Sequence, residues 1–189
     1  MPTIITGASV TSEGIVTNTL GTSNFVAGVN AGNSITSGGN YNTVVGDEAG
    51  TAITTGDNNT AVGQDALKST TTADHNTAVG QAALYTNTTG TTNTAVGRAS
   101  MYANTTGGAN TAVGYAALNT NTTASNNTAV GYQSLQANTT GAGNVAVGRQ
   151  ALAVNTTASS NTALGDQALN VNTTGASNTA VGSAALASN

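Results

Sequence analysis

Two pairs of acidic residues, which share the same spacing along the chain, are the arrangement in this sequence closest to a catalytic one. Glu48 pairs with Asp65, and Asp57 pairs with Asp74. If the chain coiled once every 17 residues, the carboxylates of each pair would stack about 5 Å apart, as neighbouring strands do. That separation is typical of retaining glycosidases. Because the coil pitch alone produces it, we predict a solvated acidic stripe and no catalytic residue, with a weakly held cation as the alternative.

The single histidine and four of the tyrosines are the other candidates for a functional role. His75 stands at a variable position before a repeated asparagine, where we expect a surface turn. The tyrosines form two pairs with the same spacing as the acids, so the rings of each pair should stack on adjacent coils. Such rings can cover the edge of a coil or a neighbouring chain, and exposed ones can contact sugar rings. The pairs are Tyr85 with Tyr102 and Tyr115 with Tyr132.

Composition excludes several classes of protein. The chain has no cysteine and one histidine, so we predict no disulfide framework, no metal site and no cofactor. Three basic residues cannot neutralise many phosphates, which argues against binding to nucleic acid. No apolar run approaches the ~20 residues of a membrane span. The first six residues, Met1 to Thr6, do not predict a secretory leader.

The proportions of residue types give contradictory indications of order. Thr, Ala, Asn and Gly number 37, 33, 25 and 24, which is 119 of 189 residues. Leu, Ile, Val and Phe together number 31, too few for an ordinary packed core, which indicates disorder. Disordered chains are usually highly charged, however, and this chain has only 3 basic and 7 acidic residues. The order of the residues must therefore decide.

That order is a 17-residue tandem repeat. The unit is N-T-A-V-G-x-x-A-L-x-x-N-T-T-G/A-x-x, and nine copies fill residues 42–189, the last one incomplete. A degenerate copy over 24–41 is one residue longer, and 1–23 lie outside the pattern. The repeated glycines are Gly46, Gly63, Gly80, Gly97, Gly114, Gly131, Gly148, Gly165 and Gly182.

The period predicts an all-β solenoid with one repeat per coil. Helical repeats usually need roughly 33 residues or more. Thr, Val and Ile, which favour extended chain, number 58. Asn and Gly tolerate positive φ, so we expect both to form the corners. Nine coils about 4.8 Å apart would make a rod of roughly 40 Å.

The Thr-Ala-Val segment predicts a strand that is dry on both faces. Its Ala and Val positions are both apolar throughout, although adjacent side chains point to opposite faces. One face would line the coil opposite the leucines, and a second copy of the chain would cover the other. We predict a homo-oligomer, most simply a parallel homotrimer around an Ala- or Val-lined axis, with a flattened monomer as the alternative. Two consecutive copies show the pattern with Asn59, Ala61, Val62, Gly63 and Leu67, then Asn76, Ala78, Val79, Gly80 and Leu84.

The Asn-Thr-Thr segment, for example residues 87–89, is a second strand candidate. Stacked asparagines can form amide ladders, and stacked threonines can hydrogen bond through their hydroxyls. We expect these ladders to join coil to coil, with the two adjacent threonines pointing to opposite sides.

The unit N-T-A-V-G-x-x-A-L resembles the N-S-x-A-I-G repeats in the heads of trimeric autotransporter adhesins, which form a trimeric β-roll. It is more similar to the repeats of tail-fibre and appendage proteins of marine bacteriophages, including cyanophages. The resemblance covers residues 42–189. The adhesin repeat is shorter, and no membrane barrel or coiled-coil stalk is recognisable here, which favours the phage family.

This resemblance implies a non-enzymatic structural protein of the virion, a rigid rod whose surface contacts a host glycan. Residues 1–23, with strand-like composition, are expected to attach to another virion protein or to cap the solenoid. The last repeat stops at Asn189 without a cap sequence, so its end would stack on another protein or be a truncation. The alternatives are a self-assembling extracellular filament or surface adhesin, and an ice-binding solenoid with threonine ladders.

Overall fold

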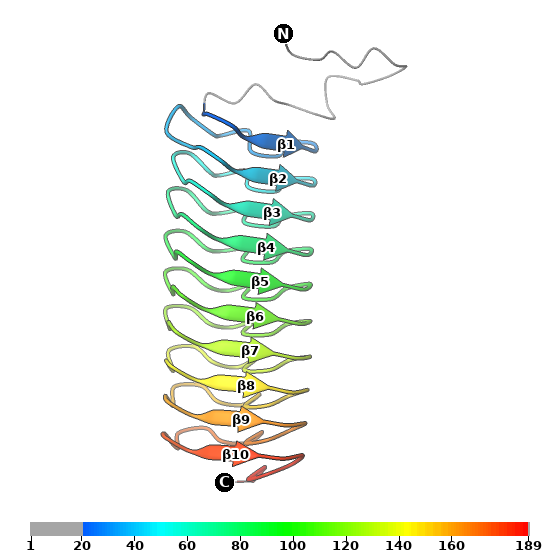
Figure 1. Ribbon diagram of the computed structural model, residues 1–189, viewed down its shortest axis with the longest axis vertical. Helices are drawn as coiled ribbons and strands as arrows, with labels where there is room; N and C mark the ends of the chain where they lie inside the picture. The colour runs from blue at the N-terminus through cyan, green and yellow to red at the C-terminus, as the bar shows by residue number, and fades with distance from the viewer. Residues whose placement is uncertain (1–20, 189) are drawn as a thin grey trace, which may run out of the picture.

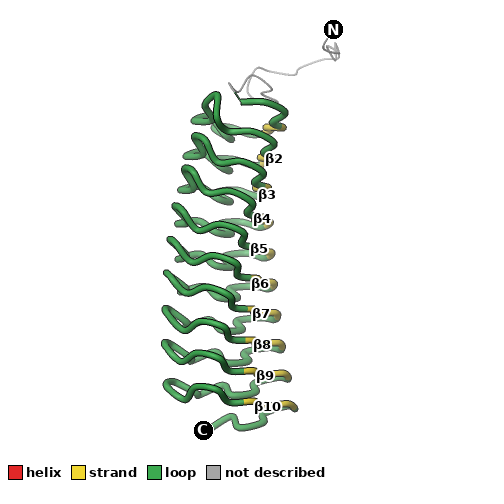
Figure 2. The backbone as a smooth tube through the Cα atoms, turned by 60° about the vertical axis from the view of Figure 1, so that its left-hand side comes forward, coloured by secondary structure: helices red, strands yellow, loops and turns green. Residues whose placement is uncertain are grey.

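The computed structural model describes residues 21–188, which form a coiled rod with one short strand in each coil (Figure 1). The coils stack one on the next along a gently curved axis (Figure 2). The predicted attachment segment, residues 1–23, falls outside the described residues except for its last three.

Ten strands form a single parallel sheet in sequence order, and each strand pairs in register with the next. No helix occurs between residues 21 and 188. The structure confirms the all-β solenoid with a 17-residue coil, and we number each coil after its strand. The strands are β1 (Phe25–Ala27), β2 (Thr43–Val45), β3 (Thr60–Val62), β4 (Thr77–Val79), β5 (Thr94–Val96), β6 (Thr111–Val113), β7 (Thr128–Val130), β8 (Val145–Val147), β9 (Thr162–Leu164) and β10 (Thr179–Val181).

Coil 1 absorbs its extra residue in a turn. The backbone N–H and the hydroxyl of Thr36 both donate to the carbonyl of Thr54 in the next coil, at 2.9 and 3.0 Å, across a separation of 18 in the sequence. The side chain of Asn24 donates to the carbonyl of Gly39, 15 residues on, whereas later coils make the same bond over 14 residues. The insertion therefore lies between residues 36 and 39, and it leaves the pairing of β1 with β2 intact.

The core is a narrow stack of small and aliphatic side chains inside the coils. In coil 4, Ala78 at the strand centre packs in the same core as Ala83 and Leu84, and all three are fully buried. Val79 points away from this core and is half-buried. Of the two linings expected for an axis between chains, alanine or valine, the alanine one is therefore wrong, because the alanines fill the interior while the valines and threonines of the strands point outward.

The repeated asparagines are not corners, contrary to expectation. Asn59 and Asn76 are fully buried and have ordinary negative φ angles. The left-handed corners of coil 3 fall instead at Asp65 (φ 60°), Leu67 (φ 51°) and His75 (φ 59°). Only the expectation for the repeated glycine holds, with φ between 124° and 138° in every coil. Asparagine is uniform because its amide forms hydrogen bonds inside the coil.

The Asn-Thr-Thr segment is not a strand either. In coil 4, Asn87 is buried whereas Thr88 and Thr89 are both exposed, so the two threonines do not alternate across a sheet. Their backbone N–H groups both donate to the carbonyl of Thr105 in the next coil, at 2.9 and 3.2 Å. The segment is an irregular turn that still bonds to its neighbour.

Coils 1 and 2 fill the same interior with different residues. In coil 2, Val44 replaces the strand alanine, Gly50 replaces the leucine, and Ile53 replaces the second asparagine. A side chain on Gly50 would begin 2.9 Å from Cδ1 of Ile53, so the isoleucine occupies the space that a side chain at this position fills in the later coils. Thr70 stands between the two core types and exchanges hydrogen bonds with Asn87, at 3.2 Å each. Coil 1 has the same arrangement with Val26, Gly32 and Ile35.

The glycine after each strand is required by the close approach of the next coil. A Cβ atom on Gly114 would lie 2.4 Å from the carbonyl oxygen of Gly131, much closer than van der Waals contact. Gly182 in coil 10 has a similar φ of 124°, but a Cβ there would meet nothing closer than 3.9 Å. Comparing Gly114 with Gly182 therefore distinguishes the strain of a positive φ from the clash with the next coil.

We predict that Gly114→Ala destabilises the fold by about 1–3 kcal/mol more than Gly182→Ala, because only the first adds overpacking between coils. Both variants share the strain of an L-residue at positive φ. Chemical denaturation followed by circular dichroism measures the difference. Equal destabilisation would show that φ alone, and not coil stacking, fixes this glycine.

Candidate functional site

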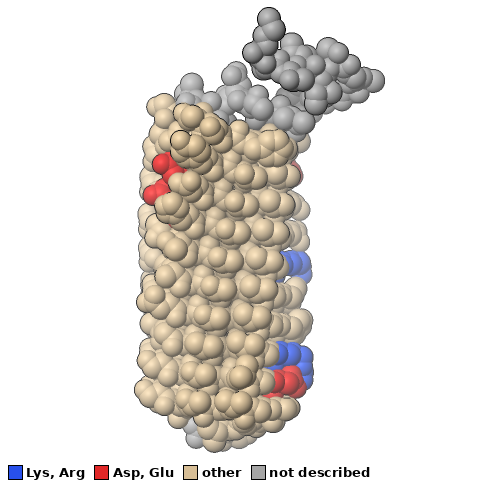
Figure 3. Space-filling view, viewed as in Figure 1, with Lys and Arg blue, Asp and Glu red and all other residues tan. Residues whose placement is uncertain are grey.

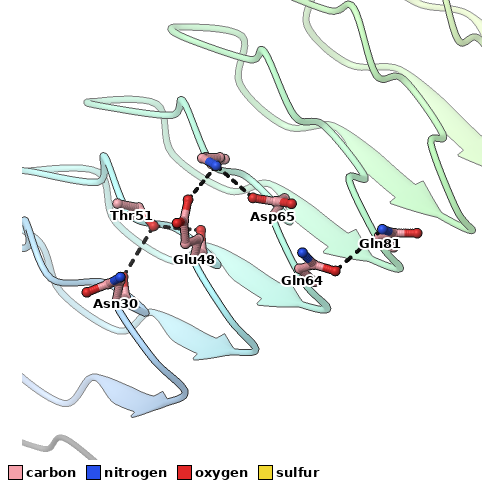
Figure 4. A network of polar contacts seen from close by, with 7 residues as sticks. Asn30, Glu48, Thr51, Gln64, Asp65 and Gln81 are labelled. Carbon is pink, nitrogen blue, oxygen red and sulfur yellow. Dashed lines mark hydrogen bonds and ion pairs between the residues drawn. The ribbon is translucent and has the colours of Figure 1, made fainter. Parts of the chain in front are cut away.

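Glu48 and Asp65 do not form a solvated acidic stripe, because both bind Lys68. The Nζ atom of Lys68 lies 2.8 Å from Oδ1 of Asp65 and also contacts Oε2 of Glu48. The two carboxylates point toward the same place between adjacent coils (Figure 4). The hydrogen bond with Asp65, followed by that with Glu48, raises the pKa of Lys68 above its ordinary value. The single lysine charge compensates one of the two carboxylate charges, and the ion pair with Glu48 joins coil 3 to coil 2.

The carboxylates of Asp57 and Asp74 each accept a backbone hydrogen bond from a turn of the preceding coil. Oδ1 of Asp57 accepts the backbone N–H of Asn40 at 2.6 Å, and Oδ1 of Asp74 accepts that of Asp57 at 2.7 Å. Ser125 and Ser159 occupy the same repeat position and accept equivalent bonds at 3.0 Å. Because a serine hydroxyl accepts the same hydrogen bond, this position requires an acceptor and not a negative charge.

The tyrosine pairs stack as their spacing predicted. The ring centroids of Tyr85 and Tyr102 lie 4.9 Å apart, and those of Tyr115 and Tyr132 lie 5.3 Å apart. Lys68 lies over the ring of Tyr85 and Arg98 over that of Tyr115, at 5.5 and 5.6 Å. Both faces of Tyr85 and Tyr115 are thus covered, so a sugar could lie only against ring edges, hydroxyls or the far end of each pair.

The Tyr115 column continues as a chain of polar contacts along one edge of the rod. Arg98 donates to Oε1 of Gln81 at 3.1 Å and to the hydroxyl of Tyr115 at 3.4 Å. Gln81 in turn donates to Gln64 at 3.4 Å. Each contact joins one coil to the next, so this column reinforces stacking while remaining exposed.

The repeated asparagine before each strand forms a continuous buried ladder. Its Oδ1 accepts the backbone N–H of the equivalent asparagine one coil on, as Asn76 does from Asn93 at 3.0 Å. From coil 2 to coil 8 its Nδ2 donates to a carbonyl of its own coil, as Asn93 does to Gly107 at 2.8 Å. One amide therefore joins two coils and closes its own coil. The ladder comprises Asn42, Asn59, Asn76, Asn93, Asn110, Asn127, Asn144, Asn161 and Asn178.

The asparagines of Asn-Thr-Thr form the second ladder, as predicted. The Nδ2 of each donates to Oδ1 of the previous one at 2.8–3.2 Å, from Asn87 to Asn172. Each Nδ2 also donates to the carbonyl three residues on, as Asn104 does to Gly107 at 2.9 Å. The Gly107 carbonyl thus accepts an amide from each ladder and joins them. Sequence reasoning missed this shared acceptor, whose one signal was the restriction of its residue to Gly or Ala.

The first threonine of Asn-Thr-Thr also acts between coils. Its hydroxyl donates to the carbonyl of the equivalent threonine one coil on, as Thr105 does to Thr122 at 3.0 Å. The second threonine is exposed in every coil from 4 to 9. The exposed column consists of Thr89, Thr106, Thr123, Thr140, Thr157 and Thr174.

The outward side of the sheet, which we call the strand face, is free of charged residues. Figure 3 shows charged side chains only along its edges. Its valine column is half-buried or exposed, and Val113, Leu164 and Val181 are 36, 47 and 67% exposed. The column contains Val45, Val62, Val79, Val96, Val113, Val130, Val147, Leu164 and Val181. Of the two strand faces that we predicted to be buried, a single chain therefore buries only the one that carries the alanines.

Comparisons with models of protein families, with curated proteins and with solved structures gave no match.

Among the described residues, no group of three or more His, Cys, Asp or Glu side chains is placed to hold a metal ion. His75 is exposed in a surface turn. No helix long and apolar enough to cross a membrane is present over residues 21–188. The described part of the chain is a solenoid with two asparagine ladders in its interior and columns of equivalent side chains on its surface.

We predict that Asn121→Ala lowers the free energy of unfolding by about 2–5 kcal/mol. It removes the partner of Asn104 Oδ1 and of one N–H of Asn138 Nδ2, and each buried unpartnered group costs about 1–3 kcal/mol. The matched control is Asn33→Ala at an exposed asparagine, which should change stability by less than about 0.5 kcal/mol. Urea denaturation measures both, and equal effects would contradict a stabilising role for the ladder.

Proposed function

We propose that this chain is a non-enzymatic structural protein, the rigid shaft of a virion fibre or appendage. The observation that carries the proposal is the unbroken stack of ten in-register strands with buried ladders running along it. Such a stack resists bending, because every coil bonds to both neighbours around its circumference. The virion location is supported by the resemblance of the repeat to phage tail-fibre proteins.

The shaft is an oligomer of identical chains, most simply a parallel homotrimer. The support is the valine column, which leaves an apolar strip along the outside of a single chain. Exposed apolar strips of this length mark interaction surfaces in soluble proteins. Attachment to another virion protein through residues 1–23, and contact with a host-surface glycan along the tyrosine edge, complete the proposal.

We predict that light scattering of the purified chain gives three times its mass of 18.2 kDa. Negative-stain electron microscopy should then show straight, discrete rods of uniform length. A monomeric mass would overturn the oligomeric shaft. Indefinite filaments would instead favour the self-assembling filament, because only the ends of the rod differ between the two.

Ice binding is a second candidate, favoured by one observation. Adjacent threonines were expected to point to opposite sides, yet Thr88 and Thr89 are both exposed. From coil 4 onward the exposed threonine column repeats at the coil spacing, and the first-threonine hydroxyls are held in fixed orientation by their bonds. An ordered hydroxyl array can organise a water lattice.

If ice binding is the function, a triple variant with lysines on alternate coils of the exposed column, Thr106→Lys, Thr140→Lys and Thr174→Lys, should lose inhibition of ice recrystallisation. The control places three lysines on the opposite turn, at Gln81, Gln133 and Gln150, and should keep it. Absence of activity in the unmodified chain at micromolar concentration would reject this candidate.

A further inference from the structure

The valine column of the strand face is uniform although nothing inside the chain requires it to be. The glycine after each strand is fixed by the next coil, and the alanines and leucines are fixed by the core. The valines point outward, where polar substitutions usually cost little. Yet this position holds Val or Leu in every coil from 2 to 10. The requirement must therefore come from outside the chain.

Neighbouring outward positions show what an unconstrained column looks like. The column two residues further along the chain contains Asp47, Gln81, Arg98, Tyr115 and Asp166. The other outward column of the strands is Thr in eight of ten coils, with Phe25 and Val145 as the exceptions. The first of these columns varies in polarity and charge, whereas the threonine and valine columns of the strands are both nearly uniform. Both exceptions in the threonine column are also apolar and exposed, which extends the apolar strip.

A second copy of this chain is the partner that fits the strip. Its side chains recur at the coil spacing, so a partner must present apolar groups with the same period along the whole rod. An identical solenoid does so by construction. The absence of charge from the strand face removes the like-charge repulsion that would oppose contact between identical surfaces (Figure 3).

The strand face reaches the lower limit of area for a specific contact. Ten strands at about 4.8 Å make it about 48 Å long, and two outward residues per strand make it about 10 Å wide. Each chain thus contributes about 500 Å², and a pair buries about 1,000 Å², the lower limit for a specific interface. Any contribution from the adjacent tyrosine edge adds to this area.

We infer that the strand faces of neighbouring chains pack in parallel and in register, with the valine column at the axis. This inference rests on the proposed oligomeric shaft and assigns the face that builds it. Each coil then meets the same coil of its partners, so Val113 lies level with Val113 and Leu164 with Leu164. Each chain alone buries its strand alanines, and contact between the copies then buries the valines.

Disulfide trapping tests the assignment directly, since the chain contains no cysteine. The variants Val62→Cys, Val113→Cys and Val147→Cys sample three levels of the axis. A disulfide needs Cβ atoms within about 3.5–4.5 Å, which only contact at the axis provides. We expect each variant, once oxidised, to give disulfide-linked dimers on a non-reducing gel, and we expect none from the control Thr106→Cys on the exposed threonine column.

Four outcomes overturn the inference. Linkage at Thr106→Cys as efficient as at the valines would place the contact on another face. Linkage at Val113→Cys alone, the level nearest the middle of the ten strands, would show antiparallel packing. An oligomeric mass without any valine linkage would reject this face while leaving the oligomeric shaft standing, whereas a monomeric mass rejects both.

A charge on the axis provides a second readout. Val113→Lys should reduce the mass measured by light scattering to that of one chain, because it places like charges together in an apolar seam. Thr106→Lys adds the same charge outside the seam and should leave the mass unchanged. Circular dichroism of both variants establishes that the solenoid is still folded, and an unchanged mass for Val113→Lys would contradict the inference.

Discussion

Every residue of this solenoid must tolerate an equivalent residue directly above and below it, about 4.8 Å away. The three-residue strands carry only part of this stacking. The backbone N–H of Leu84 donates to Ser100 in the next coil at 3.0 Å, and that of Ala82 donates to Gln64 in the previous coil at 2.9 Å. Hydrogen bonds between coils thus run around most of the circumference. In-register stacking is the constraint on which the rest of the structure depends.

The interior follows from this constraint, because a core side chain must complement copies of itself. An asparagine does so because its amide oxygen accepts from the next copy, from the backbone N–H in the first ladder and from the amide N–H in the second, so two ladders can run through a core otherwise made largely of Ala and Leu. Isoleucine does so by apolar contact, and coils 1 and 2 use it in place of the second asparagine. The two solutions cannot meet directly, since an amide facing isoleucine would lack a partner. Thr70, with a methyl group and a hydroxyl, stands at the junction. Near the other end, Nδ2 of Asn161 is buried without a partner, which marks the weakest point of the first ladder.

The sequence was sufficient for the period, the solenoid and the stacked pairs, because a fixed spacing becomes a fixed vertical neighbour in any such coil. It was insufficient for the path of the chain within one coil. Asparagine, which tolerates positive φ, was assigned to corners, yet the corners fall at Asp65, Leu67 and His75. Uniformity showed that a position was constrained but not whether the constraint was φ, a clash or an amide bond. The same ambiguity placed alanine between chains, when its small size serves the space between Ala78 and Leu84 inside one coil. The Lys68 network was missed because Lys68 stands at a different repeat position from Glu48 and Asp65, which share one.

The scarcity of charge is a consequence of stacking as well as a property of the surface. A charged residue repeated in register would face its own charge at every coil, which destabilises a sheet. Where acids do occupy equivalent positions, the structure compensates them. Lys68 binds Glu48 and Asp65, and backbone N–H groups bind Asp57 and Asp74. Where a polar column must continue, uncharged amides carry it, as Gln64 and Gln81 do. The low surface charge therefore needs no separate explanation, and the composition that first indicated disorder is the composition that in-register stacking demands.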